Sequence, residues 1–279
     1  MKVLWANANL RLKIGLIAMV FFLVLGFLVP LIPHVNPIIY NTFPKNLKVG
    51  MGGTLLGTTA LGQDIFWLMV ESLRNSILIG LIVGVIGTTV GVFIGLLSGF
   101  LGGFADRALM VLTDTFVVIP SLPILILMTS LMKGQAGIPV LALTLGLFAW
   151  AWPSRQVRAM ALSLKERDFI QTAWFSGEGA VQTVFTEILP FVWTWALSNF
   201  MNAVLTAIAS ESSLAVLGLS PANLPTLGNM IQWSRERNAI LLRQWNWIGP
   251  PVLLTIVLFI ALFLLITGYN DYQTKKRGR

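Results

Sequence analysis

The sequence predicts an all-α integral membrane protein, and the prediction follows from its low charge and its repeated long apolar stretches. Hydrophobic residues make up 56% of the 279 positions, and only 11% are Asp, Glu, Lys or Arg. Soluble domains carry about 25% charged residues, so this chain cannot cover a water-exposed surface of its size. Six windows approach the about 20 apolar residues that a membrane helix needs. They are 14–33, 77–101, 108–132, 137–154, 191–219 and 247–269.

The first window follows Lys2, Arg11 and Lys13, as the apolar part of a signal peptide does. Its apolar run is too long for that role and no small-residue cleavage pattern follows it, so we expect a retained span. Six spans place both termini on one side. Lys and Arg are more frequent on that side and include the tail "KKRGR", which predicts cytoplasmic termini.

These spans divide the chain into three regions. Residues 1–76 form the first span and a long external loop. Residues 77–269 form a core of five spans, with a cytoplasmic loop at 155–190 and a second external segment near 220–246. Residues 270–279 form a basic cytoplasmic tail. The net charge of +8 is therefore interpreted as a sign of membrane orientation rather than of nucleic-acid binding.

Few residues of this chain could support catalysis or hold a cofactor. It has no cysteine and one histidine, His34, which excludes thiolate metal sites and histidine clusters. No Gly-rich phosphate-binding loop ending in Lys-Ser/Thr is present, so the chain should not bind ATP. We expect no catalytic residue, metal or cofactor in this polypeptide.

The second window carries a strip of glycines at spacings of three or four, which places them on one face of a helix. Such a strip lets a helix of this chain or of another subunit approach closely in lipid. Its members are Gly80, Gly84, Gly87, Gly91, Gly95 and Gly99. The third window contains Pro120 and Pro123, which predict a kink.

The segment "QTAWFSGEGAVQTVFTEILP", 171–190, is polar although it lies between apolar windows. The pattern predicts one short surface helix between Ser163 and Phe175 that ends near Gly177, and a second from Glu178 to Leu189. The second helix would carry one apolar stripe. About 35 residues are more than a plain connection needs, so we interpret the segment as a docking element for a partner's groove.

This segment resembles the "EAA" loop of binding-protein-dependent ABC importer permeases, whose pattern is Glu-Ala-Ala, three residues, Gly, and a later Ile-Leu-Pro. The chain has Gln171-Thr172-Ala173, Gly177 and Ile188-Leu189-Pro190, and it departs from the pattern at the first two positions. Three further stretches are similar to the dipeptide/oligopeptide permeases. They are "LGTTALGQDIFWLMVESLRNSILIG" with Asp64, "SGFLGGFADRALMVLTDTFVVIPSLPIL" with Asp106 and Asp114, and "ASESSLAVLGLS" with Glu211, followed by "LGNM". The chain thus resembles the C-type permease of that family.

The resemblance implies a type I ABC importer permease fold with short cytoplasmic coupling helices, in a prokaryotic plasma membrane. It implies as partners a second permease, two ATP-binding subunits and an extracellular solute-binding protein, with ATP and Mg²⁺ bound by the ATPases. Gly177 would form a turn that a side chain could obstruct. The aromatic anchors would come from Phe169, Trp174, Phe175 and Phe185. The cargo would be a peptide, an oligosaccharide or a nickel complex.

Polar residues within the fifth window are candidates for the translocation path: Asn199, Asn202, Ser210 and Glu211. Acidic side chains are costly within a membrane and normally face water or a partner. For Glu211, a structural hydrogen-bonding role and a place on the path are both open. An ion-coupled secondary transporter or a channel subunit is the alternative function. Secondary transporters often contain an internal repeat, and the halves of this chain show no convincing one. A channel would leave the cytoplasmic docking segment unexplained.

Overall fold

The structure, a computed structural model, describes residues 9–131 and 137–277. Within these ranges it is helical apart from turns, loops and one isolated bridge between Thr58 and Asp64. The elements are α2 Leu10–Leu23, η1 Val24–Leu28, η2 Val29–Leu31, α3 Ile65–Leu101, α4 Gly103–Val118, α5 Ser121–Leu131, α6 Ile138–Ala149, α7 Ala151–Lys165, α8 Asp168–Phe175, α9 Ala180–Thr183, η3 Val184–Ile188, α10 Leu189–Val216, α11 Leu227–Glu236 and α12 Trp245–Arg277. Lys2, residue 132 of the third window and the end of the basic tail, 278–279, lie outside the described residues.

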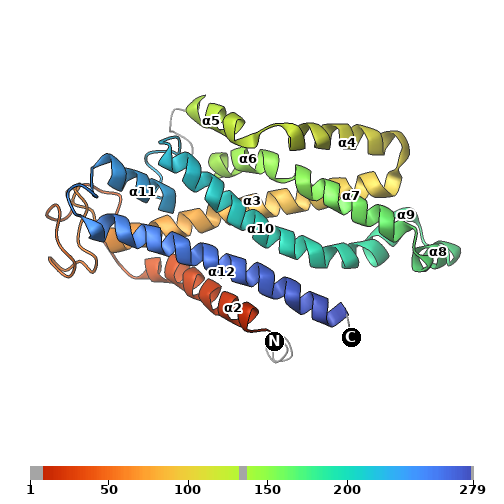
Figure 1. The fold of residues 1–279 in the computed structure, drawn as a ribbon, viewed down its shortest axis with the longest axis horizontal. Helices are drawn as coiled ribbons and strands as arrows, with labels where there is room; N and C mark the ends of the chain where they lie inside the picture. Colours follow the sequence, from red (N-terminus) through yellow and green to blue (C-terminus); the bar gives the residue numbers. More distant parts are fainter. Residues whose placement is uncertain (1–8, 132–136, 278–279) are drawn as a thin grey trace.

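The long helices lie side by side, with α8 at one end of the bundle and α11 and the 32–64 loop at the other (Figure 1). In the described part of the chain, four helical segments are long and apolar enough to cross a membrane: Leu10–Leu31, Ile65–Leu101, Val184–Val216 and Trp245–Lys275. The pair α4 and α5 makes a fifth if its two helices count as one span. The all-helical, multi-pass membrane architecture is therefore confirmed.

The first and last long helices are joined along their length. A Cβ atom on Gly15 of α2 would lie 2.6 Å from the backbone nitrogen of Leu265, and one on Gly268 of α12 would lie 2.4 Å from that of Leu12. Near the helix ends, Asp271 Oδ2 accepts from Asn9 Nδ2 at 3.2 Å and pairs with Arg11 Nη1 at 3.4 Å. The start of α2 and the end of α12 are therefore neighbours.

Helix α3 begins at Ile65, twelve residues before the window that predicted it. Asp64 caps its first turn, because its Oδ1 accepts from the backbone N–H of Phe66 at 2.8 Å and of Trp67 at 3.3 Å. The loop that was predicted to reach residue 76 on the external side therefore ends at Asp64. Burial raises the pKa of Asp64 above its ordinary value of 3.8, although these two N–H groups and His34 act in the opposite direction.

The third window is broken as its prolines predict. Ile119 is extended, with ψ of 123°, and the two helices on either side of Ile119 and Pro120 meet at an angle of 80°. The residue before a proline avoids the helical region, which explains where α4 ends. Pro123 lies in the first turn of α5, where a missing N–H donor costs no intrahelical bond.

The fourth window and the loop after it differ from the prediction. Apolar α6 has 12 residues, and after Trp150 the chain continues as α7, whose last residue is Lys165. The predicted cytoplasmic loop at 155–190 therefore starts with helix rather than loop. Residues 154–165 are rich in Ala, Leu, Met, Gln, Lys and Arg, which favour helix, so charge alone was a poor sign of a loop here.

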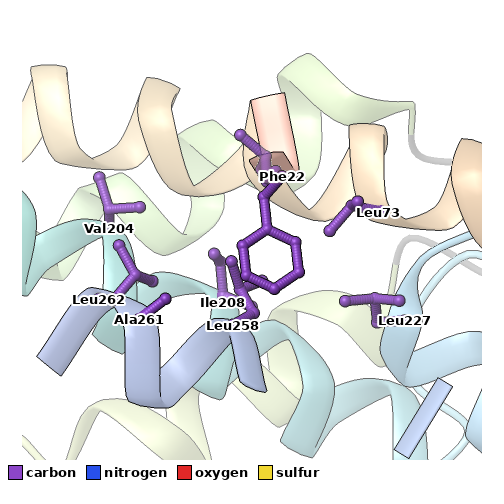
Figure 2. Packing of buried hydrophobic residues seen from close by; sticks show 9 residues of the cluster. Phe22, Leu73, Val204, Ile208, Leu227, Leu258, Ala261 and Leu262 are labelled. Atoms are coloured by element: carbon purple, nitrogen blue, oxygen red, sulfur yellow. The ribbon is translucent and has the colours of Figure 1, made fainter. Parts of the chain in front are cut away.

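A cluster of buried apolar side chains toward the α11 end of the bundle joins five helices, α2, α3, α10, α11 and α12. Figure 2 shows the ring of Phe22 from α2 among side chains of α3, α10, α11 and α12. Phe22, Leu73, Ile208 and Leu258 are almost completely buried. A second cluster, at the α8 end, contains Leu96, Val157, Ala161, Ile170, Ile188 and Val192.

Candidate functional site

Helix α8 projects at one end of the bundle (Figure 1). Phe175 is 91% exposed, and Gln171 and Thr172 are exposed as well. The opposite face carries Ile170, which is fully buried, and Ala173, which is 9% exposed. This short helix is therefore fixed to the protein by one face, and its other face is exposed.

A glycine turn ends α8. Gly177 has φ of +86°, and the N–H of Glu178 donates to the carbonyl oxygen of Ala173 at 3.1 Å. This bond across five residues with a left-handed glycine is a Schellman ending. A Cβ on Gly177 would meet no other atom within 4 Å, so a side chain would strain the turn without a clash inside the chain. Glycine is required there by its backbone conformation rather than by lack of space.

The predicted aromatic anchors have different positions. The ring of Phe169 stacks on Phe191 at 5.4 Å, so Phe169 packs within the chain. Phe185 is 64% exposed and, like Phe175, is free to meet a partner. The side chain of Trp174 lies outside the part of the chain that the structure describes.

The predicted second coupling helix, Glu178 to Leu189, is not a separate element. Its residues form α9 and η3, which continue without a break into α10. In η3, the N–H of Leu189 donates to Val184 O, a π-type bond. Pro190 follows immediately, and a proline has no N–H and clashes with the carbonyl four residues earlier, so one wider turn lets the helix continue. Ile188 is fully buried, Leu189 half-buried and Pro190 exposed.

The glycine strip of α3 lies against two other helices of the same chain. Cβ atoms on Gly80 and Gly84 would lie 2.9 Å from Ile208 and Val204 of α10. Those on the remaining four would lie 2.5–2.8 Å from the end of α6 or from α7, at Gly87, Gly91, Gly95 and Gly99. The strip therefore permits close approach by α10 in one half of α3 and by α7 in the other.

The four candidate path residues of α10 do not share one face. Asn199 is buried and its Nδ2 donates to Thr88 Oγ1 of α3 at 3.1 Å. Glu211 is also buried, Ser210 is half-buried, and Asn202 is exposed. Asn202 is therefore the member whose side chain is open to an aqueous path or a second subunit.

Glu211 belongs to a buried hydrogen-bonded network under the 217–226 loop. Its Oε1 accepts from Thr226 Oγ1 at 2.7 Å and from Ser220 Oγ at 3.1 Å. Nearby, Asn229 Nδ2 donates to Pro221 O and Leu224 O. These contacts of Oε1 join α10 to the loop and to the start of α11, as a structural hydrogen-bonding role requires.

Sequence reasoning missed a half-buried ion pair at the α8 end of the bundle. Arg158 of α7 donates from Nε to Asp106 Oδ1 at 2.6 Å and from Nη2 to Oδ2 at 2.7 Å. Ser98 of α3 donates to the same carboxylate. Asp106 had been noted only through the resemblance. The only sign of this pair in the sequence is that one segment carries an acidic residue and another carries a basic one. The two residues are 52 positions apart, so no local sequence pattern predicts their contact.

Comparisons with known proteins give concordant results. Residues 91–279 match the family model described as "Binding-protein-dependent transport system inner membrane component". The chain is 31% identical over 234 residues to the oligopeptide transport system permease protein OppC of Mycobacterium bovis, which covers 82% of this chain and 79% of that protein. It is 27% identical over 257 residues to the protein of the same name from Lactococcus lactis subsp. cremoris, with 90% and 87% covered.

Proposed function

Because the chain belongs to the family of binding-protein-dependent transport system inner membrane components, we propose that it is one permease subunit of an ATP-driven oligopeptide importer. The permease relatives are named for oligopeptide transport, which supports peptides rather than oligosaccharides as the cargo. With a second permease, the chain would form the path for peptides that an extracellular solute-binding protein delivers.

The observation that carries this proposal is the exposed α8 hairpin, by which we mean helix α8 together with the turn at Gly177. Helix α8 has a buried face on the bundle and an open face with Phe175, and it ends in the Gly177 turn. An aromatic side chain that projects from a fixed support suits insertion into a partner's pocket. The partner would be one of two ATPase subunits. These subunits would hold ATP and Mg²⁺, since this chain has no phosphate-binding loop.

Six membrane crossings are part of the proposal. At 1.5 Å per residue, the 12 residues of α6 extend only about 18 Å, which is less than the about 30 Å of a bilayer core. Helix α7 extends it after one residue, so α6 with the first part of α7 would make the fourth crossing. The bent α4–α5 pair would make the third. Both termini and α8 would then be cytoplasmic, in the plasma membrane of a prokaryote.

Asn202 is the residue that we place on the translocation path or at the second permease. It lies within the apolar segment Val184–Val216 and its side chain is exposed. An amide that faces lipid without a partner is costly, so it should face water or protein in the assembled transporter. Asn199 and Glu211 are enclosed within the chain and are not part of this surface.

Cross-linking in the assembled complex tests the proposal. The natural chain has no cysteine, so Ser176→Cys next to α8 supplies one defined thiol. We expect it to cross-link to the ATPase subunit, while the matched control Leu241→Cys, which is 80% exposed at the other end of the bundle, does not. Peptide uptake by proteoliposomes that contain the whole complex should require ATP. Uptake that follows an ion gradient and needs no ATPase would refute the function.

A further inference from the structure

The ion pair between Asp106 and Arg158 stands at the junction of three helices. Ser98 of α3, Asp106 of α4 and Arg158 of α7 meet there, and the two charged side chains are 14% and 32% exposed respectively. Both carboxylate oxygens are engaged by one guanidinium, which is the geometry that Arg provides and Lys does not. We call these three residues the α4–α7 clamp.

Helix α4 is packed less deeply than its neighbours. Among its residues only Thr113 is fully buried, while Ala105, Leu109, Met110 and Phe116 on the same face are half-buried. The ring of Phe116 on α4 lies against Phe148 and Trp150, and Asp114 and Arg155 form a second ion pair of 3.7 Å between α4 and α7. The second ion pair is more than half exposed at both side chains, and such pairs contribute little. The clamp is therefore the strongest polar link between α4 and α7.

Helix α7, in contrast, is tightly joined to α3 and to α8. Cβ atoms on Gly95 and Gly99 would lie within 2.5–2.7 Å of α7, and Lys165 Nζ donates to Phe100 O of α3 at 2.8 Å. Only Glu166 and Arg167 separate α7 from α8, and Ile170 of α8 is fully buried in the cluster with Val157 and Ala161. A displacement of α8 would therefore be passed to α7.

We propose that Asp106 and Arg158 are positioning residues for transport: they lock α4 to α7, so that a displacement of α8 moves the α4–α5 segment with the bundle. The inference rests on the proposed function, in which a partner ATPase moves α8. Coupling between two sites needs an element whose arrangement both sites influence. Without the clamp, α7 would move past α4, and ATP would be hydrolysed without delivery of peptide.

The test compares ATP hydrolysed per peptide delivered, in proteoliposomes that hold the complete complex with its binding protein. The variants are Arg158→Lys, which keeps the charge but not the two-pronged contact, and Asp106→Asn. The matched control is Arg155→Lys, which changes an exposed ion pair between the same two helices. Loss of charge-assisted hydrogen bonds should raise the ratio about tenfold in both variants with basal ATP hydrolysis retained, whereas the control should stay within about twofold of the natural chain.

Spin labels at Phe104→Cys on α4 and Glu166→Cys after α7 supply a second measurement, since both positions are exposed. We expect a broader distance distribution in the Arg158→Lys complex than in the Arg155→Lys complex. The clamp would be overturned if Arg158→Lys and Asp106→Asn left the ratio of ATP hydrolysed to peptide delivered, or the distance between the spin labels, as in the natural chain. If the natural chain still showed ATP-dependent uptake, the proposed function would not be affected. Loss of assembly in both variants would also overturn the clamp, because the pair would then serve folding. A natural chain without ATP-dependent uptake would refute the function itself.

Discussion

At the residue scale, the buried polar side chains of this protein connect helices to the loops at the α11 end. Asn75 of α3 donates to Pro225 O at 2.8 Å, and Ser76 Oγ accepts from the N–H of Leu227 at 3.0 Å. Glu211 of α10 accepts from Thr226 and Ser220 on the same loop. In an apolar surrounding each such group needs its partner, so the network fixes one arrangement of the loop.

Replacement of Glu211 separates a structural role from a role on the path. Glu211→Gln keeps an acceptor for Thr226 and Ser220, so we expect uptake and peptide preference to persist. Glu211→Ala leaves two buried hydroxyls without an acceptor and should lower the free energy of unfolding by about 1–3 kcal/mol. Thermal unfolding in detergent and peptide uptake check these outcomes. A changed peptide preference in Glu211→Gln with normal stability would contradict the structural role.

At the element scale, α8 and its turn form a small rigid unit on the end of the bundle. Gly177 is followed after one residue by Gly179, which has open space around its Cβ position and no left-handed backbone. The two glycines therefore allow a matched comparison of backbone conformation without any difference in packing.

We expect Gly177→Ala to disturb the end of α8 by about 1 kcal/mol, because an L-residue is strained at this φ. Gly179→Ala should leave the hairpin unchanged. Assembly with the ATPase subunits, measured by co-purification, should therefore fall for the first variant and not for the second. Equal assembly for both would show that the turn conformation has no part in binding the ATPase.

The glycine strip gives a second prediction for helix packing. A Cβ on Gly95 would lie 2.5 Å from Ser154 O, and backbone cannot move away as a side chain can. We expect Gly95→Ala to destabilise the chain by about 1–3 kcal/mol, as overpacking does. Gly249→Ala in α12, where no atom lies within 4 Å, is the control and should be neutral. Thermal unfolding of the two purified variants compares them, and equal midpoints would contradict the packing role.

At the scale of the whole molecule, the two ends of the bundle differ in what they present. Helix α8 lies at one end, and the 32–64 loop and α11 lie at the other (Figure 1). Impermeant thiol reagents test whether these ends face opposite sides of the membrane. We expect Leu241→Cys to react in intact cells and Ser176→Cys to react only after lysis. The reverse pattern would invert the proposed orientation.

The sequence predicted the helical membrane class and the broken third window, because apolar length and proline chemistry act locally. It misplaced the start of α3, because the apolar window excluded Glu71 and Arg74 although Asp64 supplies a helix cap. It treated α7 as loop because of its charges, yet Arg158 uses its charge on Asp106 within the bundle. The hydrogen-bond partners of Glu211 and Asp106 depend on how neighbouring helices and loops are aligned with one another, and no local sequence pattern predicts that alignment.

The division of the α3 surface between two helices has a consequence for how a permease can change shape. Gly80 and Gly84 lie against α10, and Gly87 to Gly99 lie against α6 and α7. If α3 rotates about its own axis, its contacts with α10 and its contacts with α6 and α7 change together, because one continuous helix carries all of these glycines. Opening of a passage on one side of the membrane would then require repacking on the other, so passages on the two sides could not open independently.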